Sequence, residues 1–119
     1  MLHHKPPKIM KEIEDNLTVV ENELEDFLQK HPILVEALPK IKEIIMQYYE
    51  DVVFEECINT DVEEYHTSLV LKAQTQMLMK TSLQVQRRMF NDPIFIEIIR
   101  NPAVNHFLTL NILGRIYEI

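Results

Sequence analysis

TDVEEYHTSLVLKAQTQMLMKTSLQVQRRMF, residues 60–90, contains neither proline nor glycine, and the predicted fold depends on this stretch. Thr60 and Glu63 are spaced as a capping box, in which the hydroxyl accepts a hydrogen bond from a first-turn N–H and the carboxylate reaches back. The stretch ends at Asn91-Asp92-Pro93, where proline cannot continue a helix. We therefore expect one long helix from Thr60 to about Phe90.

Apolar residues on both sides of this stretch are also spaced as in helices. They recur three and four positions apart over residues 8–30, and they cover a broad arc over residues 39–58. Proline is tolerated in the first turn of a helix, so we expect short helices over 33–38 and 93–100. We expect a last main helix from Pro102 to about Leu113, where Gly114 can end it.

The sequence therefore predicts an all-α fold, a compact helical bundle of four main helices plus two short proline-started helices. The expected organisation is a single helical domain over residues 1–119, with residues 1–7 as a disordered N-terminal extension. The expected core consists of Ile13, Leu17, Val20, Leu24, Phe27, Ile41, Ile45, Tyr48, Val52, Leu69, Ala73, Phe95, Ile98, Phe107 and Leu110.

The composition argues against several classes of protein. The single glycine, Gly114, disfavours phosphate-binding loops, dinucleotide folds and most all-β folds, because their loops and turns use several glycines. The single cysteine, Cys57, permits no intramolecular disulfide and favours a reducing compartment. No apolar run approaches the ~20 residues that cross a bilayer, so we expect a cytoplasmic protein.

Charge is unevenly distributed along the chain, whose net charge is −7. Residues 12–64 contain sixteen acids and three lysines, whereas residues 65–115 contain six bases and two acids. The acidic half disfavours nucleic acid and anionic membranes as partners. The pattern fits packing of the two halves against each other, and it also fits a basic face that meets an acidic partner.

The predicted long helix has two apolar sides. The first consists of Val62, Tyr65, Leu69, Ala73 and Met77. The second consists of Leu71, Leu78, Val85 and Met89. Two apolar sides fit either a central helix wrapped by its neighbours or a helix shared between the subunits of a homodimer. Together with Lys80 and Arg87, the second side is the candidate partner-binding surface.

One motif is compatible with metal binding. Glu63 and His66 have the Glu-x-x-His spacing that directs a carboxylate and an imidazole from one helix towards one ion, and Glu56 lies across the preceding turn. The motif occurs once, so a complete site would need a symmetric dimer, and Glu63 is also explained as a capping residue. Cys57 lies beside glutamates that disfavour its thiolate, so we expect it to be structural rather than nucleophilic.

Two helix starts nine residues apart, in NDPIFIEIIRNPAVNHFL (residues 91–108), resemble the DP-type helical repeats of co-chaperones. The resemblance is confined to this part of the chain. It implies a groove for apolar peptide segments.

We therefore predict a non-enzymatic regulatory or adaptor protein that acts through helix–helix contacts, with a protein partner or as a homodimer and without a cofactor. The alternative is a metal-binding helical protein that uses Glu56, Glu63 and His66. A further alternative is a small enzyme whose site forms between subunits.

Overall fold

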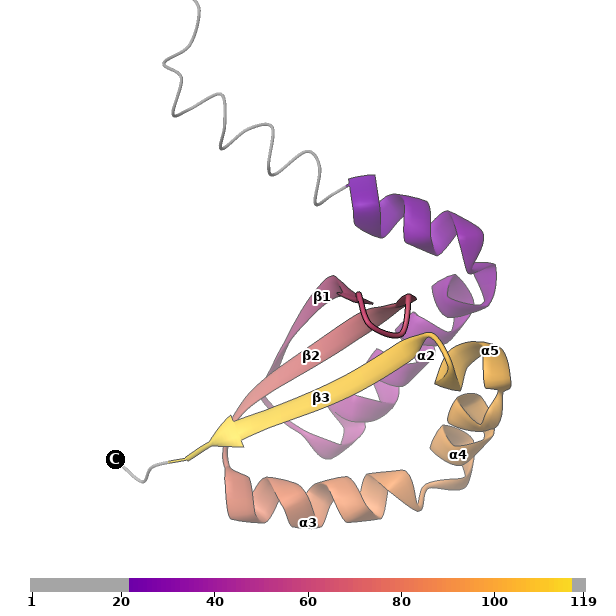
Figure 1. The fold of residues 1–119 in the computed structure, drawn as a ribbon. Helices are drawn as coiled ribbons and strands as arrows, with labels where there is room; N and C mark the ends of the chain where they lie inside the picture. The colour runs from indigo at the N-terminus through magenta and orange to yellow at the C-terminus, as the bar shows by residue number, and fades with distance from the viewer. Residues whose placement is uncertain (1–21, 117–119) are drawn as a thin grey trace, which may run out of the picture.

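The computed structural model describes residues 22–116, which form an α/β fold around a three-stranded sheet (Figure 1). Residues 22–30 are helical, and the elements that follow are α2 Pro32–Tyr48, β1 Val52–Asp61, β2 His66–Leu78, α3 Met79–Phe90, α4 Pro93–Arg100, α5 Pro102–Asn105 and β3 Leu108–Arg115. The predicted all-α helical bundle is wrong, because three segments that we expected to be helical are strands. Of the predicted long helix, α3 alone is helical.

Side-chain alternation explains the central strand, β2. Leu69, Leu71 and Ala73 belong to the core cluster, whereas the intervening Val70 is buried outside that cluster and Gln74 is exposed. Leu69 and Ala73 lie four residues apart, a spacing that puts two side chains on one face of a strand as well as on one side of a helix. The helical interpretation used this ambiguous spacing and missed the period of two, which the β-branched residues of the strand support.

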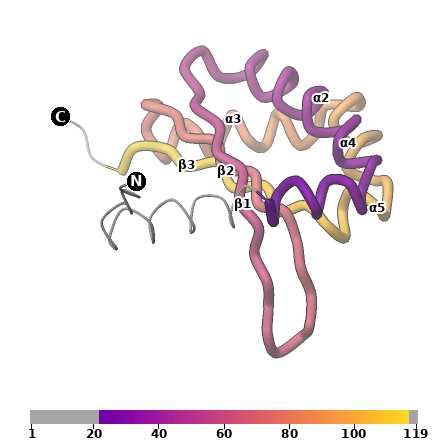
Figure 2. The backbone as a smooth tube through the Cα atoms, turned by 90° about the horizontal axis from the view of Figure 1, so that it is seen from above, coloured from indigo at the N-terminus to yellow at the C-terminus, as the bar shows by residue number. Residues whose placement is uncertain are grey.

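The three strands are ordered β1-β2-β3. β1 and β2 form a long antiparallel hairpin, from the pair Val52 and Thr75 to the pair Asp61 and His66. β3 pairs with β2 in parallel after a crossover through α3, α4 and α5. The hairpin end extends away from the helices, as Figure 2 shows.

The hairpin turn forms without glycine. The Asp61 side chain accepts hydrogen bonds from the backbone N–H groups of Glu63 and Glu64, at 3.0 and 3.2 Å. Tyr65 closes the turn with a φ of 52°, in the left-handed region that usually favours glycine or asparagine. The expected capping box is therefore wrong, because Thr60 lies in β1 and Asp61 is the residue that organises the turn.

Helix α2 continues through Pro39, which we expected to start a separate helix. Proline removes one backbone donor and leaves the carbonyl four residues earlier without its helical partner. That residue, Val35, is exposed, so water can satisfy the carbonyl. The helix ends at Tyr48 rather than near Ile58, because the β-branched residues that follow it enter β1.

The end of the chain also departs from the prediction. α4 covers the expected residues 93–100, but α5 stops at Asn105 and β3 replaces the rest of the predicted last helix. Gly114 lies inside β3 and does not end a helix. A Cβ at Gly114 would lie 2.9 Å from the Met77 carbonyl oxygen and 3.0 Å from the Met79 Cα, so only glycine allows this close approach.

The core lies between one face of the sheet and the helices (Figure 1). Twelve of the expected core residues are described, and each is buried in this core or packed partly buried against it. Ile13, Leu17 and Val20 lie outside the described residues. None of the described helices combines the length and the apolar character needed to cross a membrane.

Candidate functional site

β3 forms an edge of the sheet, because β2 is its one strand neighbour within residues 22–116. The Leu69 N–H donates a 2.8 Å hydrogen bond to the Phe107 carbonyl. The direction of the backbone N–H and C=O groups alternates along a strand. Those of Thr109 and Asn111 therefore point towards β2, as the Phe107 carbonyl does. Leu110 and its even-numbered neighbours turn theirs away from the sheet.

One of these outward groups is occupied. The Gln86 side chain in α3 donates a 3.5 Å hydrogen bond to the Ile112 carbonyl. The outward groups of Leu108 and Leu110 have no hydrogen-bond partner within the described part of the chain. An unpaired strand edge of this kind is a template for another strand.

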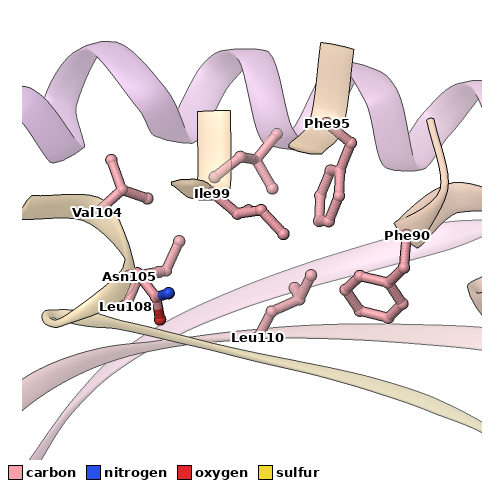
Figure 3. Close-up of a pocket in the computed structure, with 8 residues that line it drawn as sticks. Phe90, Phe95, Ile99, Val104, Asn105, Leu108 and Leu110 are labelled. Carbon is pink, nitrogen blue, oxygen red and sulfur yellow. The ribbon is translucent and has the colours of Figure 1, made fainter. Parts of the chain in front are cut away.

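An apolar pocket of about 220 Å³ lies beside this part of β3 (Figure 3). Side chains from α2, α3, α4, α5 and β3 meet around it. They are Ile41, Phe90, Phe95, Ile99, Val104, Asn105, Leu108 and Leu110. Asn105 is the one polar side chain in this lining, so the pocket suits an apolar group.

The Asp92-Pro93 sequence positions the α4 side of the pocket. The Asp92 side chain accepts from the N–H groups of Ile94 and Phe95, which fixes the first turn of α4. Phe95 is fully buried, and its ring meets the Phe90 ring edge-on, with centroids 5.2 Å apart. Ile99 follows one helical turn after Phe95 and lies on the same side (Figure 3).

A hydrogen bond at the start of α4 connects this helix to α2. The Tyr48 hydroxyl donates to Asp92 Oδ2 at 2.7 Å. This hydrogen bond is the main reason why the pKa of Asp92 lies below its ordinary value, with the N–H groups of Ile94 and Phe95 adding to it. The same bond raises the pKa of Tyr48, since ionisation of the phenol would remove the donor. Asp92 therefore favours its carboxylate form and has a structural role.

Helix α3 presents apolar side chains next to the pocket. Gln86 faces β3, as its bond to Ile112 shows, and Leu83 and Phe90 lie on the same side of the helix by their spacing. Leu83 is 49% exposed and Phe90 is 41% exposed. Apolar surface therefore continues outside the pocket along the open edge of β3.

The structure separates the candidate partner-binding residues. Leu71 in β2 and Val85 and Met89 in α3 are buried in the protein's own core, and Leu78 is half-buried at the end of β2. Three of the four apolar residues of the predicted second side are therefore packed in the protein's own core. Lys80 and Arg87 are exposed on α3.

The candidate metal ligands do not meet. Glu56 forms an ion pair with Lys42 at 2.6 Å, Glu63 lies in the hairpin turn, and the His66 Nε2 bonds to the His106 carbonyl at 2.9 Å. Five ladder pairs, roughly 17 Å of strand, separate the levels of Glu56 and His66. Within residues 22–116 no three His, Cys, Asp or Glu side chains are grouped as metal ligands.

No family model, curated protein or solved structure matches this chain. The function proposed below is therefore based on the geometry of the open β3 edge and the apolar pocket. Phe90, Ile99 and Leu108 were not among the site residues predicted from the sequence. The period of two in Leu108, Leu110 and Ile112 was the available signal, and it was masked by the expectation of a helix after Pro102.

Proposed function

We propose that this protein is a non-enzymatic binding module that receives an extended segment of another protein along β3. The single observation that carries the proposal is the position of the outward backbone groups of Leu108 and Leu110 directly beside the apolar pocket. Strand addition uses both features together, because main-chain hydrogen bonds give affinity and a side-chain pocket gives specificity.

The alternation of a strand supports this arrangement. A residue that pairs with Leu110 would share its face of the sheet, and that face lines the pocket. Every second side chain of the bound segment would therefore point towards the helices. A volume of about 220 Å³ suits one apolar side chain, since a dry cavity of about 150 Å³ is known to hold benzene.

The test is selection of a displayed library of random peptides against the full chain. We expect enriched peptides with apolar residues at alternating positions. Their binding should be lost in Ile99→Trp, which fills the pocket from α4. It should be retained in Ile94→Trp, which places the same bulk at a 64% exposed position of the same helix outside the pocket lining.

A failure to enrich any peptide would overturn the proposal, and so would peptides that bind both tryptophan variants equally. Circular dichroism and thermal unfolding of the two variants establish that each retains the fold. Sedimentation of the free protein tests the competing occupant, a second copy of the chain. A dimer that Ile99→Trp dissociates, while Ile94→Trp does not, would assign the edge to self-association instead.

A further inference from the structure

Strand β3 and helix α3, which contacts β3 through Gln86, contain basic residues and no acidic ones. α3 contributes Lys80, Arg87 and Arg88, and β3 contributes Arg115. The chain as a whole carries a net charge of −7, so these two elements are locally opposite in sign to the molecule. A charged surface of one sign selects partners of the other sign.

Helical phase places two of these bases beside the edge. Gln86 contacts β3, and Leu83 and Phe90 come next around the helix. Arg87 and Lys80 follow them on the same side, at the solvent rim. Both are exposed, and no carboxylate of residues 22–116 lies within ion-pair distance of either.

Arg88 lies on the other side of α3 and provides a contrast. It is close enough to the phenol of Tyr48 to lower the pKa of that group, which the hydrogen bond to Asp92 raises overall. Arg88 therefore lies near Tyr48 of α2. Arg88 carries the same charge on the same helix without bordering the edge.

Arg115 supplies a further cation at the end of β3. Its Nε is buried and has no hydrogen-bond partner among the described residues. The close approach of Gly114 to Met79 places this end of β3 beside the start of α3, where Lys80 lies. The two bases thus mark one end of the edge, while the pocket lies beside Leu108 and Leu110 nearer the other end.

We propose that the segment bound along β3 is acidic, with an apolar side chain in the pocket and carboxylates that face Arg87, Lys80 and Arg115. This inference rests on the proposed function and specifies its partner. Arg115 follows Leu110 by five residues, roughly 16 Å of strand. The acidic residues of the partner should therefore begin within about five positions of the residue in the pocket.

The probe is the same random peptide library, with the sequences of the enriched peptides as the first readout. We expect enrichment of Asp and Glu within five positions of an apolar residue. For a selected peptide, Arg87→Glu should weaken binding by about tenfold, and raising the salt concentration should weaken binding to the wild type. Arg88→Glu is the matched control and should leave the affinity within about twofold.

Two results would separate this inference from the proposed function. Neutral or basic peptides that still lose binding in Ile99→Trp would overturn the acidic partner and leave the strand-edge module intact. Equal effects of Arg87→Glu and Arg88→Glu would do the same, since a general field of the protein would then explain the charge dependence. Peptides that are insensitive to Ile99→Trp, or no enrichment at all, would overturn both.

Discussion

Tyr48 donates a 2.7 Å hydrogen bond to Oδ2 of Asp92, and this bond joins the last residue of α2 to the N-cap of α4. The other oxygen of the same carboxylate accepts from the N–H groups of Ile94 and Phe95. One aspartate therefore fixes both the start of α4 and its position against α2. The pocket depends on that position, because Ile41 of α2 and Phe95 of α4 line it together.

The stabilising effect of this bond should depend on pH at both extremes. The folded-state pKa of Asp92 is lowered from 3.8, so its contribution is present above that value and is lost as pH falls through the lower pKa. The pKa of Tyr48 is raised from 10.0, so its contribution is present below that value and is lost as pH rises through the higher pKa. We expect Tyr48→Phe to lower the melting temperature between these limits and to have a smaller effect outside them.

Thermal unfolding followed by circular dichroism from pH 3 to pH 11 measures this difference. Tyr65→Phe is the control, because Tyr65 is 91% exposed and its loss should not change the melting temperature. A difference between wild type and Tyr48→Phe that is constant across pH would contradict the prediction.

Backbone amides of β3 should exchange with solvent in an alternating pattern. The Leu110 N–H points away from the sheet, whereas the N–H groups of Thr109 and Asn111 point towards β2. We expect Leu110 to exchange faster than both neighbours in the free protein, and to become protected when a selected peptide binds. Hydrogen exchange measured by NMR resolves the three amides. Equal protection of all three in the free protein would show that the edge is already paired.

Relief of the backbone strain at Tyr65 in the hairpin turn should stabilise the protein. Tyr65 adopts a φ of 52°, which costs a non-glycine residue on the order of 1 kcal/mol, and its exposed ring makes up little of that cost. We expect Tyr65→Gly to leave stability unchanged or raise it by up to about 1 kcal/mol in urea denaturation. Val62→Gly in the same turn should lower stability, because Val62 has no positive φ to relieve. A loss in Tyr65→Gly as large as that in Val62→Gly would argue against strain at Tyr65.

Substitution of a buried residue from the predicted second apolar side should lower the stability of the fold. Val85 is 4% exposed and belongs to the core, whereas Leu83 on the same helix is 49% exposed. We expect Val85→Ala to reduce the free energy of unfolding by about 1–3 kcal/mol, and Leu83→Ala to reduce it by less than about 1 kcal/mol. Urea denaturation gives the free energies, and sedimentation gives the oligomeric state. A change of oligomeric state in Val85→Ala without loss of stability would instead support the second apolar side as a subunit contact.

The expected core list contained six of the sixteen residues that form the buried core, and the predicted fold class was wrong. Leu69 and Ala73 were expected to be buried and are buried, because a spacing of four serves both a helix and a strand. Leu71 and Leu78 show where the helical interpretation fails. They lie seven residues apart, which is one side of a helix but opposite faces of a strand, and only Leu71 is buried in the core.

The candidate site depends on contacts that no local pattern contains. Lys80 and Arg87 were named from the sequence, and they lie at the rim of the proposed edge site. The apolar residues grouped with them, Leu71, Val85 and Met89, are buried in the core, because β2 and α3 do not form one continuous helix. The pocket joins Ile41 of α2 to Leu110 of β3, with the β1–β2 hairpin and three helices between them in the chain, and sequence periodicity carries no information about such pairs.

The parallel pairing of β2 and β3 also sets an order of assembly. The hairpin strands are neighbours in the chain, whereas Leu69 meets Leu108 only after three helices have formed a return path. Loop-closure entropy makes such a contact late. Until β3 pairs with β2, the edge of β2 that β3 covers is exposed, and Leu108 and Leu110 do not yet line the pocket. Immature chains should therefore be prone to aggregate through β2 and unable to engage a partner, which ties binding competence to the last folding step.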